Sequence, residues 1–79
     1  MQRYEVINSS TGLSLGRFLA DSPEAAVNAM ARAQGYPGGA SEMAAERGET
    51  ETRLRHRTRA VPVFTPSEAA AVMVALRES

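Results

Sequence analysis

Two segments near the N-terminus alternate apolar and polar residues as β-strands do. Residues 3–8 (RYEVIN) and 13–19 (LSLGRFL) are rich in branched and aromatic side chains and flank the turn-forming sequence SSTG. This pattern predicts an antiparallel β-hairpin. Because successive side chains point to opposite faces of a strand, Tyr4 and Val6 should share one face of the first strand.

The same alternation places Leu13, Leu15 and Leu19 together on one face of the second strand. Ile7 and Phe18 then fall on the opposite faces of their strands. Apolar side chains on both sides predict that the hairpin is covered, at least partly, on both faces.

The next segment has the start and stop signals of a helix. Ser22 can cap it, Pro23 suits the first helical position, and Glu24 lies near the positive end of the helix dipole. The helix should run to about Gln34, because Gly35 can adopt the left-handed conformation that ends helices. Its inner face consists of small and apolar residues at helical spacing: Ala26, Val27, Met30 and Ala33.

Two further helices are predicted in the second half of the chain. After a loop at 36–39, residues 41–47 (SEMAAER) can form a short helix that ends at Gly48. Residues 65–68 (TPSE) match a capping box and predict a terminal helix over about 66–77. The inner stripe of that helix would contain Ala69, Val72, Met73 and Leu76.

The terminal helix is apolar around nearly its whole circumference, since Val74 lies away from the stripe that holds Val72 and Leu76. A helix that is apolar on two sides is buried on two sides or meets another chain. We therefore predict self-association, as a homodimer, through Val72, Val74 and Leu76.

Residues 49–59 (ETETRLRHRTR) carry a charge at every second position. A period of two fits a strand better than a helix, which would scatter the charges and place threonines inside. We therefore predict a strand over 49–60. Its arginines would emerge together on a flat, water-facing side: Arg53, Arg55, Arg57 and Arg59. A proline shortly afterwards suits an exposed sheet edge.

Together these segments predict an α+β fold in one small domain over residues 1–79, in the order β-β-α-(short α)-β-α. The helices would cover one face of a three-stranded sheet, and a third strand antiparallel to the first would give the order 2-1-3. Fourteen of the apolar residues are alanine, so the core is small and a partner would help stabilise the chain.

Three interpretations of the arginine-lined segment compete. The side chains could be a solvated face, paired with Glu5, Glu49 or Glu51. Four arginines in line could follow a phosphate backbone, although the net charge is zero and no aromatic residue lies within the segment. Exposed arginines are also good anchors for a protein partner.

The composition argues against most catalytic chemistry. The absence of cysteine excludes disulfides, thiolate nucleophiles and cysteine-based metal sites. His56 is the only histidine, and no orienting acid or nucleophile lies near it in the sequence. Gly35, Gly38 and Gly39 lack the lysine and spacing of a phosphate-binding loop. We expect no enzyme, no metal and no cofactor.

The N-terminal sequence lacks the apolar core of a secretion signal, and no apolar run approaches the ~20 residues of a membrane span. These features predict a cytoplasmic protein that does not associate with membranes.

An opening hairpin (YEV…TG…LG) followed by a short alanine-rich helix (ADSPEAAVNAMARAQG) is similar in layout to small proteins of phages and mobile elements, including some type I anti-CRISPR proteins. The resemblance covers about residues 4–35 and assigns no functional residue. It implies an inhibitor that binds a subunit of the CRISPR surveillance complex and blocks recruitment of DNA or nuclease. We therefore favour a non-catalytic protein-binding inhibitor that uses Arg53–Arg59. The alternatives are a nucleic-acid-binding accessory protein and a structural subunit of a larger assembly.

Overall fold

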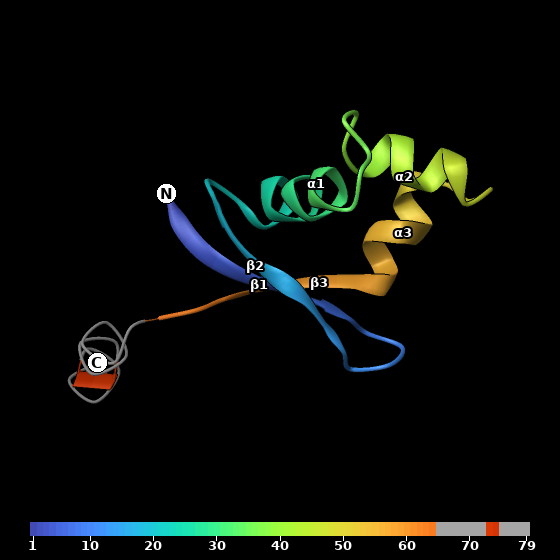
Figure 1. The fold of residues 1–79 in the computed structure, drawn as a ribbon. Helices are drawn as coiled ribbons and strands as arrows, with labels where there is room; N and C mark the ends of the chain where they lie inside the picture. Colours follow the sequence, from blue (N-terminus) through green and yellow to red (C-terminus); the bar gives the residue numbers. More distant parts are fainter. Residues whose placement is uncertain (65–72, 75–79) are drawn as a thin grey trace.

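A three-stranded antiparallel sheet forms one layer of the fold in the computed structural model, which describes residues 1–64, 73 and 74 (Figure 1). The strands are β1 (Gln2–Asn8), β2 (Ser14–Ala20) and β3 (Thr58–Pro62). Their order in the sheet is β2-β1-β3, with both neighbours antiparallel to β1. The predicted hairpin, the α+β class and the strand order 2-1-3 are confirmed.

The hairpin contains a bulge. Val6 pairs with Gly16 and Ile7 pairs with Ser14, which leaves Leu15 without a partner in β1. Gly16 has a φ of 123°, a conformation that side-chain-bearing residues rarely adopt. Glycine at this position therefore allows the extra residue to be accommodated without steric strain.

The bulge changes which leucines reach the core. Leu15 packs against the core together with Phe18, whereas Leu13 and Leu19 are exposed. The prediction that the three leucines share one face is wrong, because an extra residue interrupts the alternation of side chains along the strand. Phe18 instead lies opposite Tyr4 in the register and joins it on the buried side.

Three helices are present in the described part of the chain: α1 (Pro23–Ala33), α2 (Ala40–Glu46) and α3 (Glu51–Arg57). Figure 1 shows α1 lying over one side of the sheet, while α3 descends from α2 to the start of β3. Ser22 caps α1, its Oγ accepting a hydrogen bond from the Ala25 backbone at 3.1 Å. The first helix and the short helix near 41–47 are both confirmed.

The core lies between this side of the sheet and the helices. Tyr4 and Val6 contribute from β1, and the largest fully buried side chains of the helices are Met30, Met43 and Leu54. Small buried residues fill the remaining space and allow close approach: Ala20, Ala26, Ala31, Ala40 and Ala44. The alanine-rich composition thus yields a thin core shared by all three helices and the sheet.

The inner face of α1 differs from the prediction at one position. Ala26, Val27 and Met30 are buried as expected, but Ala33 is exposed and Ala31 is buried instead. Ala31 lies four residues after Val27, so both occupy the same side of the helix.

Most of the terminal helix predicted over 66–77 lies outside the described residues, as do Val72 and Leu76, while Met73 and Val74 are described and helical. Val74 is described and is exposed. Self-association through these three residues stays a prediction.

Candidate binding surface

The charged segment is largely helical. Residues Glu51–Arg57 form α3, and only Thr58–Pro62 is extended, so the strand predicted over 49–60 is wrong for most of its length. Thr50 caps the helix, its Oγ1 accepting a hydrogen bond from the Arg53 backbone at 3.1 Å. Local capping and helix-favouring arginines therefore outweigh the two-residue charge period.

Leu54 gives the helix its tertiary anchor. It is the one apolar residue of α3 and is fully buried. At the C-terminal end, the Thr58 hydroxyl donates a hydrogen bond to the Leu54 carbonyl at 2.9 Å. A helix of seven residues is marginal alone, so burial of Leu54 against the other elements decides the conformation.

The four arginines predicted to form a flat docking surface are separated. Arg53 is exposed on α3, whereas Arg59 is exposed on β3. Arg55 and Arg57 are half-buried and hold the fold together. The predicted surface is wrong in its geometry, because helical side chains spaced two residues apart point in different directions.

Arg55 joins α3 to α1. Its guanidinium donates hydrogen bonds to Glu51 Oε1 at 3.0 Å, to the Glu24 carbonyl at 3.2 Å and to Asn28 Oδ1 at 3.1 Å. Asn28 Oδ1 also accepts a hydrogen bond from the Ala40 backbone at 3.0 Å, at the start of α2. The Asn28 side chain therefore connects all three helices.

Arg57 serves the turn between α2 and α3. Its Nη2 lies 2.6 Å from Glu49 Oε2, and both side chains are half-buried. The Arg57 carbonyl accepts a hydrogen bond from the Ser9 backbone at 2.8 Å, which ties the hairpin turn to the end of α3. Replacing Arg55 or Arg57 with an acidic residue would therefore destabilise the fold, so such a variant would not report on binding alone.

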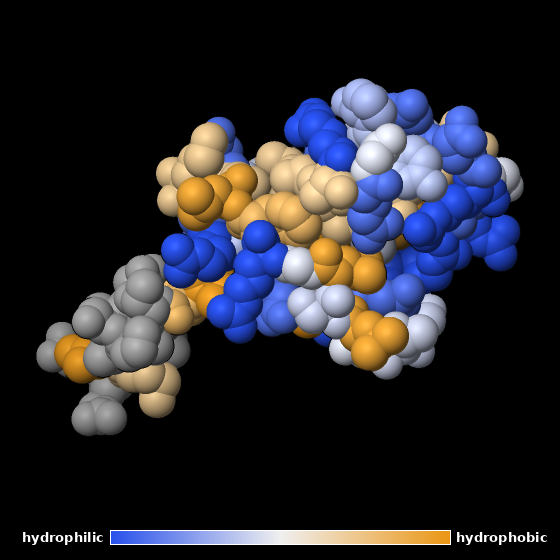
Figure 2. All heavy atoms as spheres, viewed as in Figure 1, coloured by the Kyte–Doolittle hydropathy of each residue, from blue (hydrophilic) through white to orange (hydrophobic). Residues whose placement is uncertain are grey.

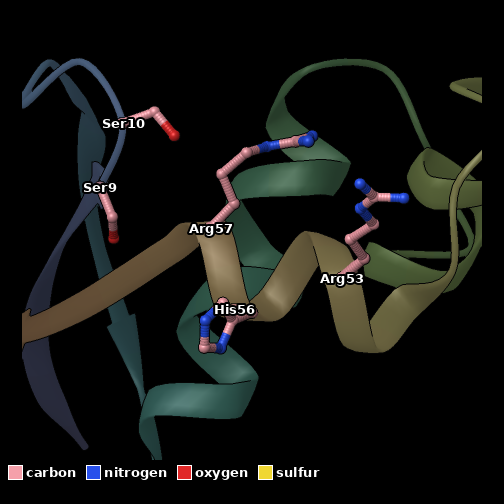
Figure 3. Close-up of a pocket in the computed structure, with 5 residues that line it drawn as sticks. All are labelled: Ser9, Ser10, Arg53, His56 and Arg57. Carbon is pink, nitrogen blue, oxygen red and sulfur yellow. The ribbon is translucent and has the colours of Figure 1, made fainter.

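A shallow hollow of about 400 Å³ lies between the hairpin turn and α3, lined by Ser9, Ser10, Arg53, His56 and Arg57. Figure 3 shows the guanidinium groups of Arg53 and Arg57 on one side of the helix and the imidazole of His56 on the other. Nucleophilic catalysis needs a nucleophile and a base within hydrogen-bond reach of each other. These groups do not converge on one point, so their arrangement offers no such pair.

The side of the sheet opposite the helices presents a different surface. The strand register places Ser14 and seven larger side chains on it, and we call these seven the outer face: Arg3, Glu5, Ile7, Arg17, Leu19, Arg59 and Val61. Their alternation with the buried Tyr4 and Val6 fixes this assignment. Within residues 1–64, the helices lie on the other side of the sheet (Figure 1).

Large apolar side chains are exposed on the outer face. Leu19 is 60% exposed and Val61 is 36% exposed. The other exposed large apolar residues of 1–64 are Met1, Leu13 and Phe64, at the chain start, the hairpin turn and just beyond β3. None belongs to α1, α2 or α3, and Figure 2 shows hydrophilic residues covering the end of the molecule that α2 and α3 form.

The outer face is also unbalanced in charge. Arg17 lies directly opposite Glu5 in the register, Arg3 lies two residues along β1, and Arg59 lies on the neighbouring strand. Glu5 is the only carboxylate among the seven residues. Among the described residues no carboxylate comes within ion-pair distance of Arg3, Arg17 or Arg59. The face therefore carries a net charge of about +2 (three arginines, one glutamate) at neutral pH.

The two edges of the sheet are less suited to a partner strand. β2 is interrupted by its bulge and carries Arg17, and β3 is five residues long and ends at Pro62. Bulges, charges, short strands and prolines are the features that discourage pairing at sheet edges. A partner of the sheet is therefore better placed on the outer face.

The sequence contains a pattern that indicates part of the outer face, although the predicted contact residues are not chosen from it. Arg3 and Glu5 occupy the alternate positions of the first strand that face away from Tyr4 and Val6. That alternation marks the outer face on β1, and the strand register adds Arg17 and Leu19 to it. Of the predicted contact residues only Arg59 belongs to it, and the six side chains absent from that prediction are Arg3, Glu5, Ile7, Arg17, Leu19 and Val61.

The described residues, 1–64 with 73 and 74, contain no cluster of three or more histidine, aspartate or glutamate side chains arranged to hold a metal ion. In the same residues, each helix is too short or too polar to cross a bilayer.

No protein-family model matches the chain, and comparison with curated proteins and with solved structures gives no significant match. The similarity in layout to anti-CRISPR proteins therefore stays a prediction, and the function has to be inferred from the geometry of the surface.

Proposed function

We propose that the protein is a small non-catalytic binding module that docks onto another protein through the outer face of its sheet. The observation that carries this proposal is the combination of exposed apolar side chains and arginines on a sheet face that no helix of residues 1–64 covers. Exposed apolar surface rimmed by polar groups is typical of sites where proteins bind one another.

The chemistry of the outer face favours a protein partner. Leu19 and Val61 can be buried against an apolar surface, which supplies the free energy of association. Arginine combines a planar, multidentate cation with an apolar stem and is enriched at the energetic centres of protein interfaces. A rigid sheet beneath these residues limits the entropy lost on docking.

Within this class we propose an inhibitor, as the resemblance of residues 4–35 to type I anti-CRISPR proteins implies. The protein would occupy a surface of the CRISPR surveillance complex and exclude DNA or nuclease by steric and electrostatic means. Such a mechanism needs a stable docking face and no active site. The support for this specific role is the resemblance in layout, together with an exposed docking face.

Affinity capture from the native host tests the proposal. The full chain serves as bait beside a variant of the outer face, Leu19→Ser with Val61→Ser, and a control, Ala33→Ser with Ala45→Ser, at exposed helical positions. The wild type and the control should retain the same protein, whereas the outer-face variant should lose it. Equal retention by all three baits would contradict docking through the outer face.

The inhibitor role has its own measurement. A purified type I surveillance complex is incubated with target DNA, with and without the protein, and DNA binding and nuclease recruitment are measured separately. One of the two steps should be blocked by the wild type and by the Ala33→Ser/Ala45→Ser control, but not by the outer-face variant. Undiminished activity in both steps would remove the anti-CRISPR role and leave protein binding in place.

The second candidate function is nucleic-acid binding by Arg3, Arg17 and Arg59. The excess of positive charge on the outer face favours it. Three phosphate contacts predict a log–log salt slope of about −2.7 on duplex DNA, at about −0.9 per contact. A gel-shift series across salt concentrations measures this slope, and absence of binding at about 50 mM salt would reject the candidate.

A further inference from the structure

We infer that the outer face recognises an acidic protein surface in which apolar side chains lie between carboxylates. This inference rests on the proposed protein-binding function and specifies the chemistry of the partner. It depends on how the strand register interleaves charge and apolar groups across the three strands.

The register arranges the outer face in rows across the sheet. In one row Leu19 lies opposite Arg3, and in the next Arg17 and Val61 lie on either side of Glu5. Neighbouring strands are ~4.8 Å apart, so each apolar side chain lies within one or two strand spacings of a guanidinium group. A complementary partner must present carboxylates and apolar groups at a similarly fine spacing.

Glu5 is too little negative charge to neutralise the arginines of the outer face. It lies at the centre of the face, directly opposite Arg17, with Arg3 two residues away on the same strand. One carboxylate cannot compensate three guanidinium groups, and planar forks of this kind bind carboxylates in a bidentate manner. The remaining donors are therefore available to carboxylates of a partner.

A second copy of the chain does not satisfy this surface through the same face. Two outer faces stacked on each other would bring six arginines together with two glutamates. Like charges placed in contact across an interface cost several kcal/mol. A partner with negative charge would instead form attractive interactions with these arginines.

Nucleic acid satisfies the arginines but not the apolar residues. Single strands are bound through aromatic side chains on which bases stack, and the seven residues of the outer face include none. Leu19 and Val61 would lie against a hydrated phosphate backbone and lose the benefit of burial. The pattern is better matched by a polypeptide.

The outer face alone is smaller than a stable interface. Its outermost side chains span about 10 Å across the strands and about 13 Å along them, whereas a standard interface buries roughly 800 Å² on each partner. A partner must therefore also contact residues around the outer face.

The test is a titration of the full ¹⁵N-labelled chain, followed by the shifts of its backbone amide signals, with three probes. The first is a random copolymer of glutamate and tyrosine at four to one, the second is poly-glutamate, and the third is a 12-base-pair DNA duplex. The copolymer should shift the amides of the outer-face residues. It should bind about tenfold more tightly than poly-glutamate, because burying one or two apolar groups is worth about 1.4 kcal/mol.

Matched variants identify the residues that bind the copolymer. Arg17→Gln with Arg59→Gln should weaken copolymer binding at least tenfold, since it removes the charged hydrogen bonds that these arginines donate to the carboxylates of the copolymer. The control, Arg32→Gln with Arg47→Gln, removes two exposed arginines outside the sheet and should leave binding within a factor of two. Thermal unfolding of all variants verifies that the fold is retained.

Several outcomes would overturn the inference. Tighter binding of the duplex than of the copolymer at the same residues would assign the face to nucleic acid. Contacts of Leu19 and Val61 with residues 65–79 in nuclear Overhauser spectra of the free protein would show that the chain covers its own face. Equal binding of the copolymer by the wild type and by the Arg17→Gln/Arg59→Gln variant would show that these charges do not contribute to binding.

The failure of this inference is distinguishable from failure of the proposed function. If affinity capture retains a protein that depends on Leu19 and Val61 but not on Arg17 and Arg59, protein binding stands and the acidic partner is rejected. If the capture depends on neither pair, the proposed function fails as well.

Discussion

The two faces of the sheet differ in side-chain composition and in exposure to solvent, although the same three strands form both. The inner side places Tyr4 and Val6 under α1, where they are almost completely buried. The outer side places Leu19 and Val61 in solvent beside three arginines. The inner side is explained by the free energy of folding, whereas the apolar part of the outer side lowers solubility without contributing to the described core.

This difference separates two classes of arginine that look alike in the sequence. Arg55 and Arg57 lie on the helical side and form hydrogen bonds that hold α3 in place. Arg17 and Arg59 lie on the outer face and form no ion pair with a described residue. Substitutions on the two sides should therefore separate stability from binding.

Leu54→Ala should produce the largest loss of stability. The side chain is fully buried and is the anchor of α3, and truncations of this kind cost about 2–5 kcal/mol. A chain of this size has a total folding free energy of about 4–12 kcal/mol, so much of the population would unfold. Urea denaturation measures the effect, and a loss below about 1 kcal/mol would contradict the assigned packing of α3.

Asn28→Ala should have the next largest effect, about 1–3 kcal/mol, because it leaves the Ala40 amide and the Arg55 guanidinium without their acceptor. Asn28→Asp is the matched control, since its carboxylate can accept both hydrogen bonds and gains an attraction to Arg55. Thermal denaturation should show the alanine variant clearly below the wild type and the aspartate variant near it. Equal melting of both variants would contradict the role of Asn28 in connecting the helices.

Thr50→Ala should cost about 1 kcal/mol, because it removes the hydroxyl that caps α3. Thr52→Ala provides a control inside the same helix, at an exposed position without a capping role. It should be neutral or slightly stabilising, since alanine favours helix formation. Chemical denaturation of the pair decides between the helix and the charged strand that the sequence pattern predicts.

The smallest effect on stability is expected on the outer face. Leu19→Ser and Arg17→Gln should each change the free energy of unfolding by less than about 0.5 kcal/mol, because both side chains are exposed and hold no described contact in the core. Urea denaturation measures the change. A loss of about 2 kcal/mol at Leu19, the size expected for a buried side chain, would show that the outer face belongs to the folding core and would remove the contrast between the two sides.

Prediction from the sequence succeeds where local signals agree with one another. Ser22, Pro23 and Gly35 mark the start and end of α1, and each acts as expected in the structure. Residues 49–57 contain conflicting signals: charges at every second position favour a strand, whereas Thr50 and Glu51 are suited to the start of a helix. The strand prediction gives the charge period more weight than capping, and the arginine surface inferred from it is therefore misplaced.

The sequence by itself determined the hairpin, the first two helices and the α+β class, because alternation, capping residues and glycines act over a few residues. For α3 the sequence supplied the cap at Thr50, and the tertiary structure settled the helix, since burial of Leu54 and the hydrogen bonds that Asn28 accepts from Arg55 and Ala40 involve residues distant in the chain. It likewise decided which arginines face solvent. Pairing of β3 with β1 brings Arg59 onto the same face as Arg3 and Arg17, and a local pattern carries no information about such a pairing.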